Sequence, residues 1–385
     1  MTTNQSIKEL YDKIFTVDFL IRNGYYDVQS KSAIITRMSA FNYGKSDGML
    51  ENIFNMNGFV NFLNCWTEYE NLDEYVLEKR IATEPISFTI PKSENSRREY
   101  KMINVYSYLA LISFVVKNKA TFIEAFLNDT FSISKYFNQF NFSFERTAEF
   151  KKELLEGGRK ILHTDLSNFY PTLYTHSIAW MIDGKEKSKK NQITGFPNEL
   201  DKLIEKCQFN ETHGIPTGNL TTRIIAELYM CHFDKELSSR MADTDAKYAR
   251  YVDDIEFPFN TETDSDDFLK NFEYLCRKYG LNVNENKIEV TDFPRIDRMD
   301  KTTIFNFLDD INGEKSSYNW RTKIKDLIGL CISEEAKGNK GSLKSSFAII
   351  INALKREHIN SVCINRIFSA RHEITNFNLF GKFYN

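Results

Sequence analysis

Two adjacent aspartates, Asp253 and Asp254, stand between two short apolar runs of the chain. The flanking residues 247–252 and 255–259 alternate like two strands of a hairpin, which predicts both aspartates at its tip. A third candidate, Asp165, ends a separate short apolar run and precedes a turn. If that run is a neighbouring strand ending at the carboxyl edge of the sheet, three carboxylates meet in one small volume.

Such a cluster favours divalent cations. Unperturbed aspartates titrate near pH ~4, so at neutral pH the group is ionised and repels itself unless cations neutralise it. Two Mg²⁺ ions, with Mn²⁺ as an alternative, suit hard oxygen ligands and phosphoryl transfer at a metal separation of roughly 3.5 to 4 Å. We expect Asp165 and Asp253 to bridge the ions and Asp254 to be the weaker, outer ligand. The alternative is that Asp253 and Asp254 only mark a solvated turn.

A glycine- and proline-punctuated loop, Gly214–Leu220, lies between these carboxylates in the sequence. A helical pattern follows it, with apolar residues at Leu220, Ile224, Leu228 and Cys231. A flexible loop that leads into a helix could lie over the sugar and base of an incoming nucleotide. The order of the segments, after Asp165 and before Asp253, strengthens this interpretation.

In sequence order these segments resemble motifs A, B, C and D of the reverse transcriptase palm. Motif D would be Gly280–Lys287, and the resemblance implies that Lys287 protonates pyrophosphate; the alternative is an ordinary exposed lysine. Tyr170 matches the aromatic steric gate that excludes a ribose 2′-hydroxyl, so dNTPs would be the substrates, although its ring could also pack beside Phe169. The resemblance further implies a metal ligand in the backbone carbonyl of Leu166 and nucleotide contacts from Phe169, Tyr170, Pro216, Thr217 and Gly218.

Several longer strings resemble the abortive-infection reverse transcriptases, and among them the AbiK family most closely: Tyr43–Asp47, Arg97–Met102, Asp165–Tyr170, His176–Lys185 and Glu227–Lys235. This resemblance implies antiphage defence by a DNA polymerase that needs no RNA template and starts from a tyrosine of its own chain. The single-stranded DNA product would stay covalently attached to the protein. The protein would assemble as a homo-oligomer, a trimer or a hexamer.

Tyr43 is the candidate priming residue under this resemblance. A priming hydroxyl must approach a metal ion and lose a proton whose unperturbed pKa is ~10, so it needs a mobile segment and a Lewis acid. Gly44 and Gly48 would supply flexibility around Tyr43. The chain has 19 tyrosines, and most tyrosines pack or decorate a surface.

Two features favour synthesis without a template. Ordinary reverse transcriptases usually carry glutamine where this chain has Thr217, and the shorter side chain weakens the contact to a paired nucleotide. The formal net charge is -3, whereas proteins that grip long duplexes tend to be basic. A local basic groove remains compatible with that average.

A basic group, Arg97, Arg98 and Lys101, precedes the apolar helix-like stretch 105–116 and is the candidate site for the triphosphate. Arginine forks match phosphate oxygens with two-point geometry. The alternative is a solvated charged face.

Composition is that of a globular protein, with 42% hydrophobic and 27% charged residues in 385. The six cysteines are scattered without metal-binding spacing, which favours reduced thiols. The most apolar stretch, 108–116, is shorter than the ~20 residues of a membrane span, and the polar N-terminus is no signal peptide. We expect a cytoplasmic protein without a membrane partner.

The motif order predicts an α+β fold with reverse-transcriptase-like fingers and palm. The fingers would span residues 1–160, and the palm would span 161–300. Residues 301–385 would form an α-helical region in place of a thumb, with helical patterns over 320–332, 343–354 and 360–369. The charge-rich stretch 185–190 is expected to be a solvated loop.

The helical region is shorter than the repeat array of the AbiK family, so apolar surface could be exposed or paired with another subunit. Three hypotheses follow. The first is a protein-primed, template-independent DNA polymerase, and the second is a template-directed reverse transcriptase that uses a bound RNA. The third is a polymerase-fold binding module without turnover, which the intact Asp165, Asp253 and Asp254 set disfavours.

Overall fold

The computed structural model describes residues 4–25, 56–65, 81–93, 96–137, 150–190, 194–241, 247–292 and 326–333. The chain divides into two compact units, residues 1–292 and 293–385. In the second unit, residues 326–333 form a helix with Leu327, Ile328 and Cys331 buried, and this helix overlaps the helical stretch predicted over 320–332. The helices predicted at 343–354 and 360–369 lie outside the described residues. The predicted domain boundaries at residues 160 and 300 stay predictions.

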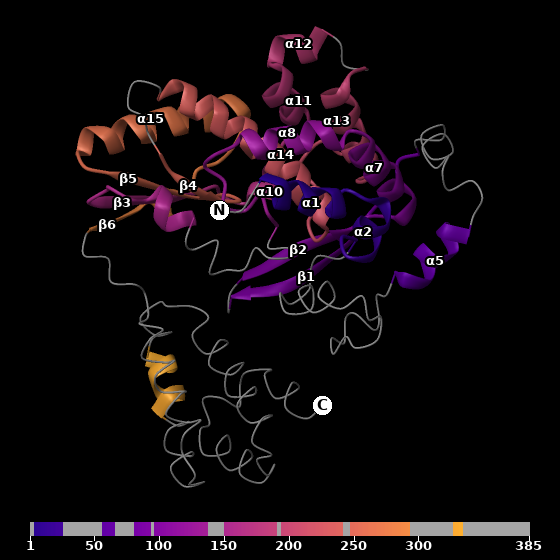
Figure 1. The fold of residues 1–385 in the computed structure, drawn as a ribbon, viewed down its shortest axis with the longest axis horizontal. Helices are drawn as coiled ribbons and strands as arrows, with labels where there is room; N and C mark the ends of the chain where they lie inside the picture. Colours follow the sequence, from indigo (N-terminus) through magenta and orange to yellow (C-terminus); the bar gives the residue numbers. More distant parts are fainter. Residues whose placement is uncertain are drawn as a thin grey trace. The chain divides into compact units, whose positions relative to one another are not determined.

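The first unit mixes helices with two antiparallel sheets, so the predicted α+β class is confirmed (Figure 1). Its described elements are α1 (Asn4–Ile14), α2 (Val17–Arg22), α5 (Asn57–Cys65), β1 (Ile86–Ser93), β2 (Ser96–Met102), α7 (Val105–Lys117), α8 (Lys119–Asn128), β3 (Lys160–Asp165), α10 (Phe169–Thr172), α11 (Thr175–Asp183), α12 (Lys185–Lys190), α13 (Phe196–Lys206), α14 (Leu220–Arg240), β4 (Ala249–Tyr251), β5 (Asp254–Phe259), α15 (Glu262–Tyr279), the 3₁₀ turn η3 (Glu285–Lys287) and β6 (Glu289–Asp292).

The larger sheet has the strand order β4-β5-β3-β6, and all of its pairs are antiparallel. In the register of β3 with β5, Leu162 faces Phe257 and Asp165 faces Asp254. Strand β4 pairs with β5 so that Tyr251 faces Asp254. Val252 and Asp253 therefore form the two-residue turn, and Asp254 already belongs to a strand, one residue earlier than the sequence pattern predicted.

Strand alternation gives the larger sheet two different faces. Side chains at Ile255, Phe257 and Phe259 of β5 are buried, and the ring of Phe257 stacks on Phe268 of α15 with centroids 4.2 Å apart. Figure 1 shows α15 lying along this face of the sheet. Because successive side chains of a strand point to opposite faces, Asp254 projects from the face that α15 leaves uncovered.

Helix α14 is the central element of the core. Buried residues lie on all sides of it, among them Leu228, Tyr229 and Phe233, which is typical of a helix surrounded by protein. It begins at a cap in which the Asn219 side chain accepts a hydrogen bond from the Thr222 N–H at 2.8 Å. Helix α14 therefore starts directly after the glycine- and proline-containing loop, and farther along its Glu227 and Asp234 contact Arg250 of β4.

The smaller sheet is the β1–β2 hairpin, and the loop Gly214–Asn219 connects it to the rest of the unit. The Lys101 N–H donates to the Thr217 carbonyl at 3.0 Å, and the Thr217 hydroxyl donates to the Glu99 carbonyl at 2.8 Å. At its other end the loop contacts α10, where the Ile215 N–H donates to the Tyr170 carbonyl at 2.9 Å. The loop is thus held on two sides by backbone hydrogen bonds.

Residues 185–190 form helix α12, so the prediction of a solvated loop there was wrong. The Ser188 hydroxyl donates to the Ala179 carbonyl at 2.8 Å, and the Lys185 ammonium lies 4.5 Å from the centroid of the Trp180 ring. These contacts involve Ala179 and Trp180 of α11, which lie outside the charge-rich stretch that suggested a loop. Among the helices that the structure describes, none has the length and apolar character needed to cross a membrane. Cys207, Cys231, Cys276 and Cys331 are free thiols.

Gly214→Ala should destabilise the first unit more than Gly280→Ala. Both glycines have a left-handed backbone, with φ of +76 and +74 degrees, so each alanine costs about 1–2 kcal/mol of conformational strain. At Gly214 a Cβ would also lie 2.6 Å from the Pro171 carbonyl oxygen, whereas nothing lies within 4 Å at Gly280. We expect urea unfolding to give a free energy about 1 kcal/mol or more lower for Gly214→Ala than for Gly280→Ala. Equal losses would contradict the packing of the loop on α10.

Candidate active site

The carboxyl end of β3 and the turn between β4 and β5 bring the three predicted aspartates together. Asp165 is buried, Asp253 is half-buried and Asp254 is exposed. Asp165 and Asp254 are directly opposite across the two strands, so their side chains leave the sheet on the same face. The Leu166 N–H approaches the Asp253 carbonyl oxygen at 3.4 Å. Backbone pairing therefore collects carboxylates that are far apart in sequence.

The electrostatics of the group follow from burial and like charge. Burial, followed by the charges of Asp165 and Asp254, raises the pKa of the Asp253 carboxyl to about 7. Burial and the charge of Asp165 also raise the pKa of Asp254. Asp165 and Asp253 are close enough to hydrogen-bond, although the ligand atoms of all three aspartates do not come within 4.8 Å of one another. Asp254 is thus the outer member of the group.

Lys287 reaches this group from η3. Its Nζ contacts the Asp165 carboxylate, and this hydrogen bond raises the pKa of Lys287, which therefore stays protonated. The Asn284 side-chain amide donates to the same Asp165 oxygen at 3.3 Å, and the Asn284 N–H donates to the Asp165 carbonyl at 2.8 Å. The segment that follows α15 therefore supplies a cation and two donors to Asp165.

The backbone carbonyl of Leu166 points toward the turn that carries Asp253. Leu166 pairs with Val283 through hydrogen bonds made by the residues on either side of it, Asp165 and Ser167. In such a pair the N–H and C=O of the middle residue point away from the partner strand. The Leu166 N–H points away from Val283 and toward the Asp253 carbonyl, and the Leu166 carbonyl lies on the same side of the strand. The position of the Leu166 carbonyl is therefore compatible with its predicted role as a metal ligand.

The reverse transcriptase pattern is also found by comparison with known proteins. Residues 90–320, more than half of the chain, match the family described as "Reverse transcriptase (RNA-dependent DNA polymerase)". The chain belongs to the reverse transcriptase family. No curated protein matches it.

Two solved structures are similar to this reverse transcriptase chain. One is apo telomerase from Candida tropicalis, at 13% identity and a TM-score of 0.36, covering 82% of this chain and 66% of the telomerase chain. The other is the same telomerase truncated from its C-terminal domain, at 13% identity and a TM-score of 0.38, covering 75% of this chain and 73% of that one. The chain thus spans just under two thirds of the first telomerase chain.

The three basic residues predicted to bind a triphosphate are divided between the two faces of the β1–β2 hairpin. Arg97 and Lys101 share one face, whereas Arg98 lies on the opposite face, next to Tyr100. Arg97 already donates to the Thr89 hydroxyl at 2.7 Å and to the Thr89 carbonyl at 2.9 Å. Lys101 lies 3.7 Å from Glu211. The three side chains do not converge on one site, and their role in binding a triphosphate stays a prediction.

The aromatic residues after β3 divide between core and surface. The Phe169 ring is buried and lies 6.3 Å from the Tyr229 ring, so it supports the turn rather than lining an open surface. Tyr170 is half-buried against Phe169, with ring centroids 5.3 Å apart, and its carbonyl holds the Gly214–Asn219 loop. Pro216 is buried, and Thr217 and Gly218 are half-buried beside β2. Tyr43 lies outside the described residues.

A second group of potential ligands lies away from these aspartates. Among the described residues, His176, Asp201 and Glu205 place one ligand atom each within 4.8 Å of the others. His176 Nδ1 is 2.5 Å from Asp201 Oδ2, and Lys202 Nζ is 3.0 Å from Glu205 Oε2. Lys202 and the hydrogen bond with His176 thus supply partners to the carboxylates. We interpret this group as a polar cluster that ties α11 to α13.

Sequence reasoning missed two kinds of residue at the site. Asn284 lies inside the stretch that suggested Lys287, but an asparagine in a loop has no signal that distinguishes it from a turn residue. Ser134 and Arg250 contact the backbone of the Val252–Asp253 turn from behind. Nothing in the sequence near Ser134 indicates this contact, because 118 residues separate it from Val252.

The stability of the metal-free protein should fall between pH 6 and pH 8. The folded-state pKa of Asp253, about 7, lies above its ordinary value of 3.8, so the folded protein holds a proton that the unfolded chain has released. The stabilisation from this proton is fully present below pH ~4 and is lost as the pH rises through about 7. The free energy of unfolding should therefore fall by about 1 kcal/mol between pH 6 and pH 8.

Urea unfolding in chelator at the two pH values measures this loss. Asp253→Asn should be less sensitive to pH than the wild type. Asp266→Asn, which changes an exposed aspartate on α15, should keep the wild-type slope. Parallel pH profiles for the wild type and Asp253→Asn would contradict the raised pKa.

Proposed function

We propose that this protein is a DNA polymerase that joins dNTPs at the group formed by Asp165, Asp253 and Asp254. The observation that carries the proposal is the convergence of these carboxylates from β3 and the β4–β5 turn, with Lys287 in contact with Asp165. Membership of the reverse transcriptase family supports the same activity. If Asp253 and Asp254 only marked a solvated turn, the fold would need neither a buried Asp165 beside them nor the contact of Asp165 with Lys287.

The residues present fit divalent metal ions. Burial and mutual repulsion raise the pKa values of Asp253 and Asp254, so these groups accept positive charge readily. Asp165, Asp253 and Asp254, with the Leu166 carbonyl, would hold Mg²⁺ or Mn²⁺. Bound there, the ions would supply Lewis-acid stabilisation of the attacking hydroxyl and of the phosphate. Lys287 would give a proton to the departing pyrophosphate, and its raised pKa and its contact with Asp165 support this role.

We further propose that Tyr170 selects dNTPs over ribonucleotides. The residue follows Asp165 by five positions, and its half-buried ring packs on Phe169. The bond from Ile215 to the Tyr170 carbonyl fixes the backbone at this point. An aromatic ring whose backbone is held in place can exclude a ribose 2′-hydroxyl by steric contact, whereas a mobile ring would move aside.

The proposal includes synthesis without a template. In this chain the Thr217 hydroxyl donates to the Glu99 carbonyl of β2, so its short polar group is engaged by the hairpin. That arrangement supports a weak contact between the Thr217 side chain and a nucleotide paired to a template. The resemblance to the abortive-infection family supports the remaining parts: priming from Tyr43, a homo-oligomer, and a role in antiphage defence.

A template-directed reverse transcriptase is the second candidate. The family to which residues 90–320 belong is described as RNA-dependent, and this favours it. The two candidates share the aspartates and differ in whether RNA is required.

Purified protein with labelled dNTPs and Mg²⁺ alone should give radiolabel that survives a denaturing gel and is lost on protease treatment. Asp253→Asn should reduce this label by about a thousandfold or more, because the variant loses several kcal/mol of charge stabilisation. Asp266→Asn is the matched control and should label normally. A strict need for added RNA would favour the template-directed enzyme. Equal labelling by Asp253→Asn and the wild type would refute the proposed active site.

Tyr43→Phe should abolish covalent attachment of DNA to the protein. The substitution removes only the hydroxyl that would start the chain, so extension of an added DNA primer should remain measurable. Tyr274→Phe, at an exposed tyrosine of α15, provides the matched control and should label as the wild type does. Unchanged labelling of Tyr43→Phe would assign the priming hydroxyl to another residue.

A further inference from the structure

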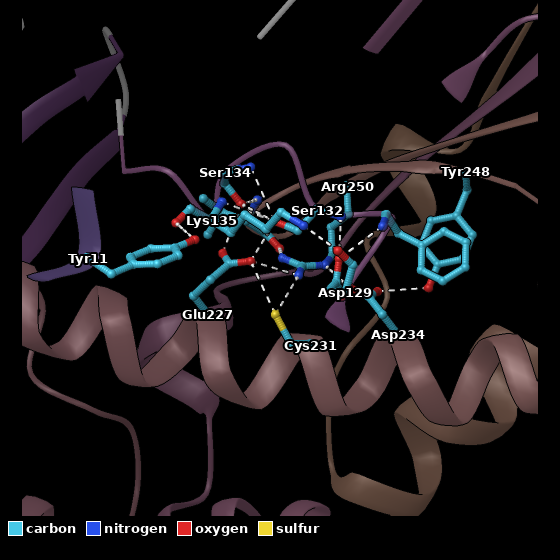
Figure 2. Close-up of polar contacts among 12 residues, drawn as sticks. Tyr11, Asp129, Ser132, Ser134, Lys135, Glu227, Cys231, Asp234, Tyr248 and Arg250 are labelled. Carbon is cyan, nitrogen blue, oxygen red and sulfur yellow. Dashed lines mark hydrogen bonds and ion pairs between the residues drawn. The ribbon is translucent and has the colours of Figure 1, made fainter. Parts of the chain in front are cut away.

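A buried polar group contacts the backbone of Val252 in the β4–β5 turn. Figure 2 shows its side chains, with those of Glu227, Cys231 and Asp234 rising from α14. Its centre is Arg250 of β4, whose side chain is fully buried. The Arg250 guanidinium donates from Nε to Asp234 at 2.6 Å and from Nη2 to Glu227 at 2.8 Å. Both carboxylates belong to α14, one of them two turns after the other. Arg250 stays protonated, since these two carboxylates outweigh burial and raise its pKa.

The group continues from Glu227 to the segment that follows α8. The Ser132 hydroxyl donates to one Glu227 oxygen at 2.6 Å, and the Ser134 hydroxyl donates to the other at 2.8 Å. This segment runs beside β4, because the Arg250 N–H donates to the Phe131 carbonyl and the Ile133 N–H donates to the Arg250 carbonyl. Glu227 therefore fixes the orientation of Ser134 next to the turn.

Both backbone polar groups of Val252 are bound by this group. The Val252 N–H donates to Ser134 Oγ at 2.9 Å, and Arg250 Nη1 donates to the Val252 carbonyl at 3.1 Å. The hydroxyl of Ser134 can accept this bond because its own proton goes to Glu227. The two contacts clamp one peptide residue from opposite ends.

Val252 needs such a clamp because of its backbone conformation. Its φ is +60 degrees, in the left-handed region that β-branched residues avoid. Without the two hydrogen bonds the residue would relax toward negative φ, and the direction of the next residue, Asp253, would change. A strained turn beside the reacting group persists only when its surroundings hold it.

We propose that Ser134 and Arg250, oriented by Glu227, are positioning residues that hold Val252 in its left-handed conformation and so present Asp253 to Asp165. This inference rests on the proposed polymerase function and deepens it. An apolar core of the same volume would be no less stable than two carboxylates and a guanidinium, so stability alone does not account for the buried charges. Directional hydrogen bonds to one turn do account for them.

Ser134→Ala in the full chain tests the proposal by direct metal binding. The dissociation constant of Mn²⁺ is measured from the electron paramagnetic resonance signal of the free ion, without any reaction. We expect a weakening of about 10- to 100-fold, the usual effect of losing an outer partner of a ligand. In the labelling assay kcat should fall while KM for the dNTP changes little, because the variant alters the carboxylate and not the nucleotide contacts.

Rescue distinguishes positioning from general stability. Glycine adopts positive φ without a steric penalty, so Val252→Gly in the Ser134→Ala background should restore most of the Mn²⁺ affinity and kcat. If Ser134 served only stability, Val252→Gly should lower Mn²⁺ affinity and kcat further, because glycine loses more conformational freedom on folding than valine does. Ser132→Ala is the matched control. It removes the other hydroxyl on Glu227, and with it the acceptor of the Ser134 and Lys135 N–H groups, but it leaves both hydrogen bonds of Val252 in place. It should therefore weaken Mn²⁺ binding less than Ser134→Ala.

Wild-type Mn²⁺ affinity and kcat in folded Ser134→Ala would overturn the proposal, and so would a failure of Val252→Gly to restore either one. If circular dichroism shows that Ser134→Ala does not fold, Ser134→Cys replaces it, and its weaker acceptor should give an intermediate affinity; an unchanged affinity would again overturn the proposal. The two proposals can also fail separately. If the wild type incorporates no dNTP while Ser134→Ala still binds Mn²⁺ more weakly than the wild type, the positioning role is supported and the polymerase function is refuted.

Discussion

The register between β3 and β5 is the constraint on which the candidate active site depends. It places Asp165 opposite Asp254 and puts Asp253 in the turn. Because side chains alternate between the faces of a sheet, a slip of one residue would send Asp165 or Asp254 toward the face covered by α15. Phe257 and Phe259 are buried on that face, and they resist such a slip because Phe257 would lose its packing on Phe268 of α15 and both rings would leave the core. Hydrophobic burial on one face therefore sets the position of charge on the other.

The surroundings of this register come from segments that are remote in sequence. The Gly214–Asn219 loop binds the Tyr170 carbonyl on one side and β2 on the other, so it connects the turn after Asp165 to the β1–β2 hairpin. Behind the turn, Arg250 and Glu227 join β4, α14 and the segment after α8. Both connections use directional hydrogen bonds, which specify orientation more narrowly than apolar contact does.

Local patterns predicted the elements that lie closest to the site. The apolar run before Asp165, the alternating residues around Asp253 and the helix after Asn219 all form as expected, because period-two and helical patterns record which faces are buried. The charge pattern misled at one place, because residues 185–190 form a helix that packs Lys185 over Trp180. Strand alternation puts Arg98 on the other face of β2 from Arg97 and Lys101, which closeness in sequence does not record.

By itself, the sequence predicted which residues would carry the chemistry: the three aspartates, Lys287 after them, and the turn that follows Asp165. Residue type, order and local period contain that information, and they also indicated the reverse transcriptase family. Only the tertiary structure decided how these residues act on one another. The raised pKa of Asp253, the contact of Lys287 with Asp165, and the clamp of Ser134 on Val252 depend on distances between segments more than a hundred residues apart or on different strands. Such distances follow from packing of the whole unit, because charge and hydrogen-bond energies change steeply with separation while sequence spacing does not record it.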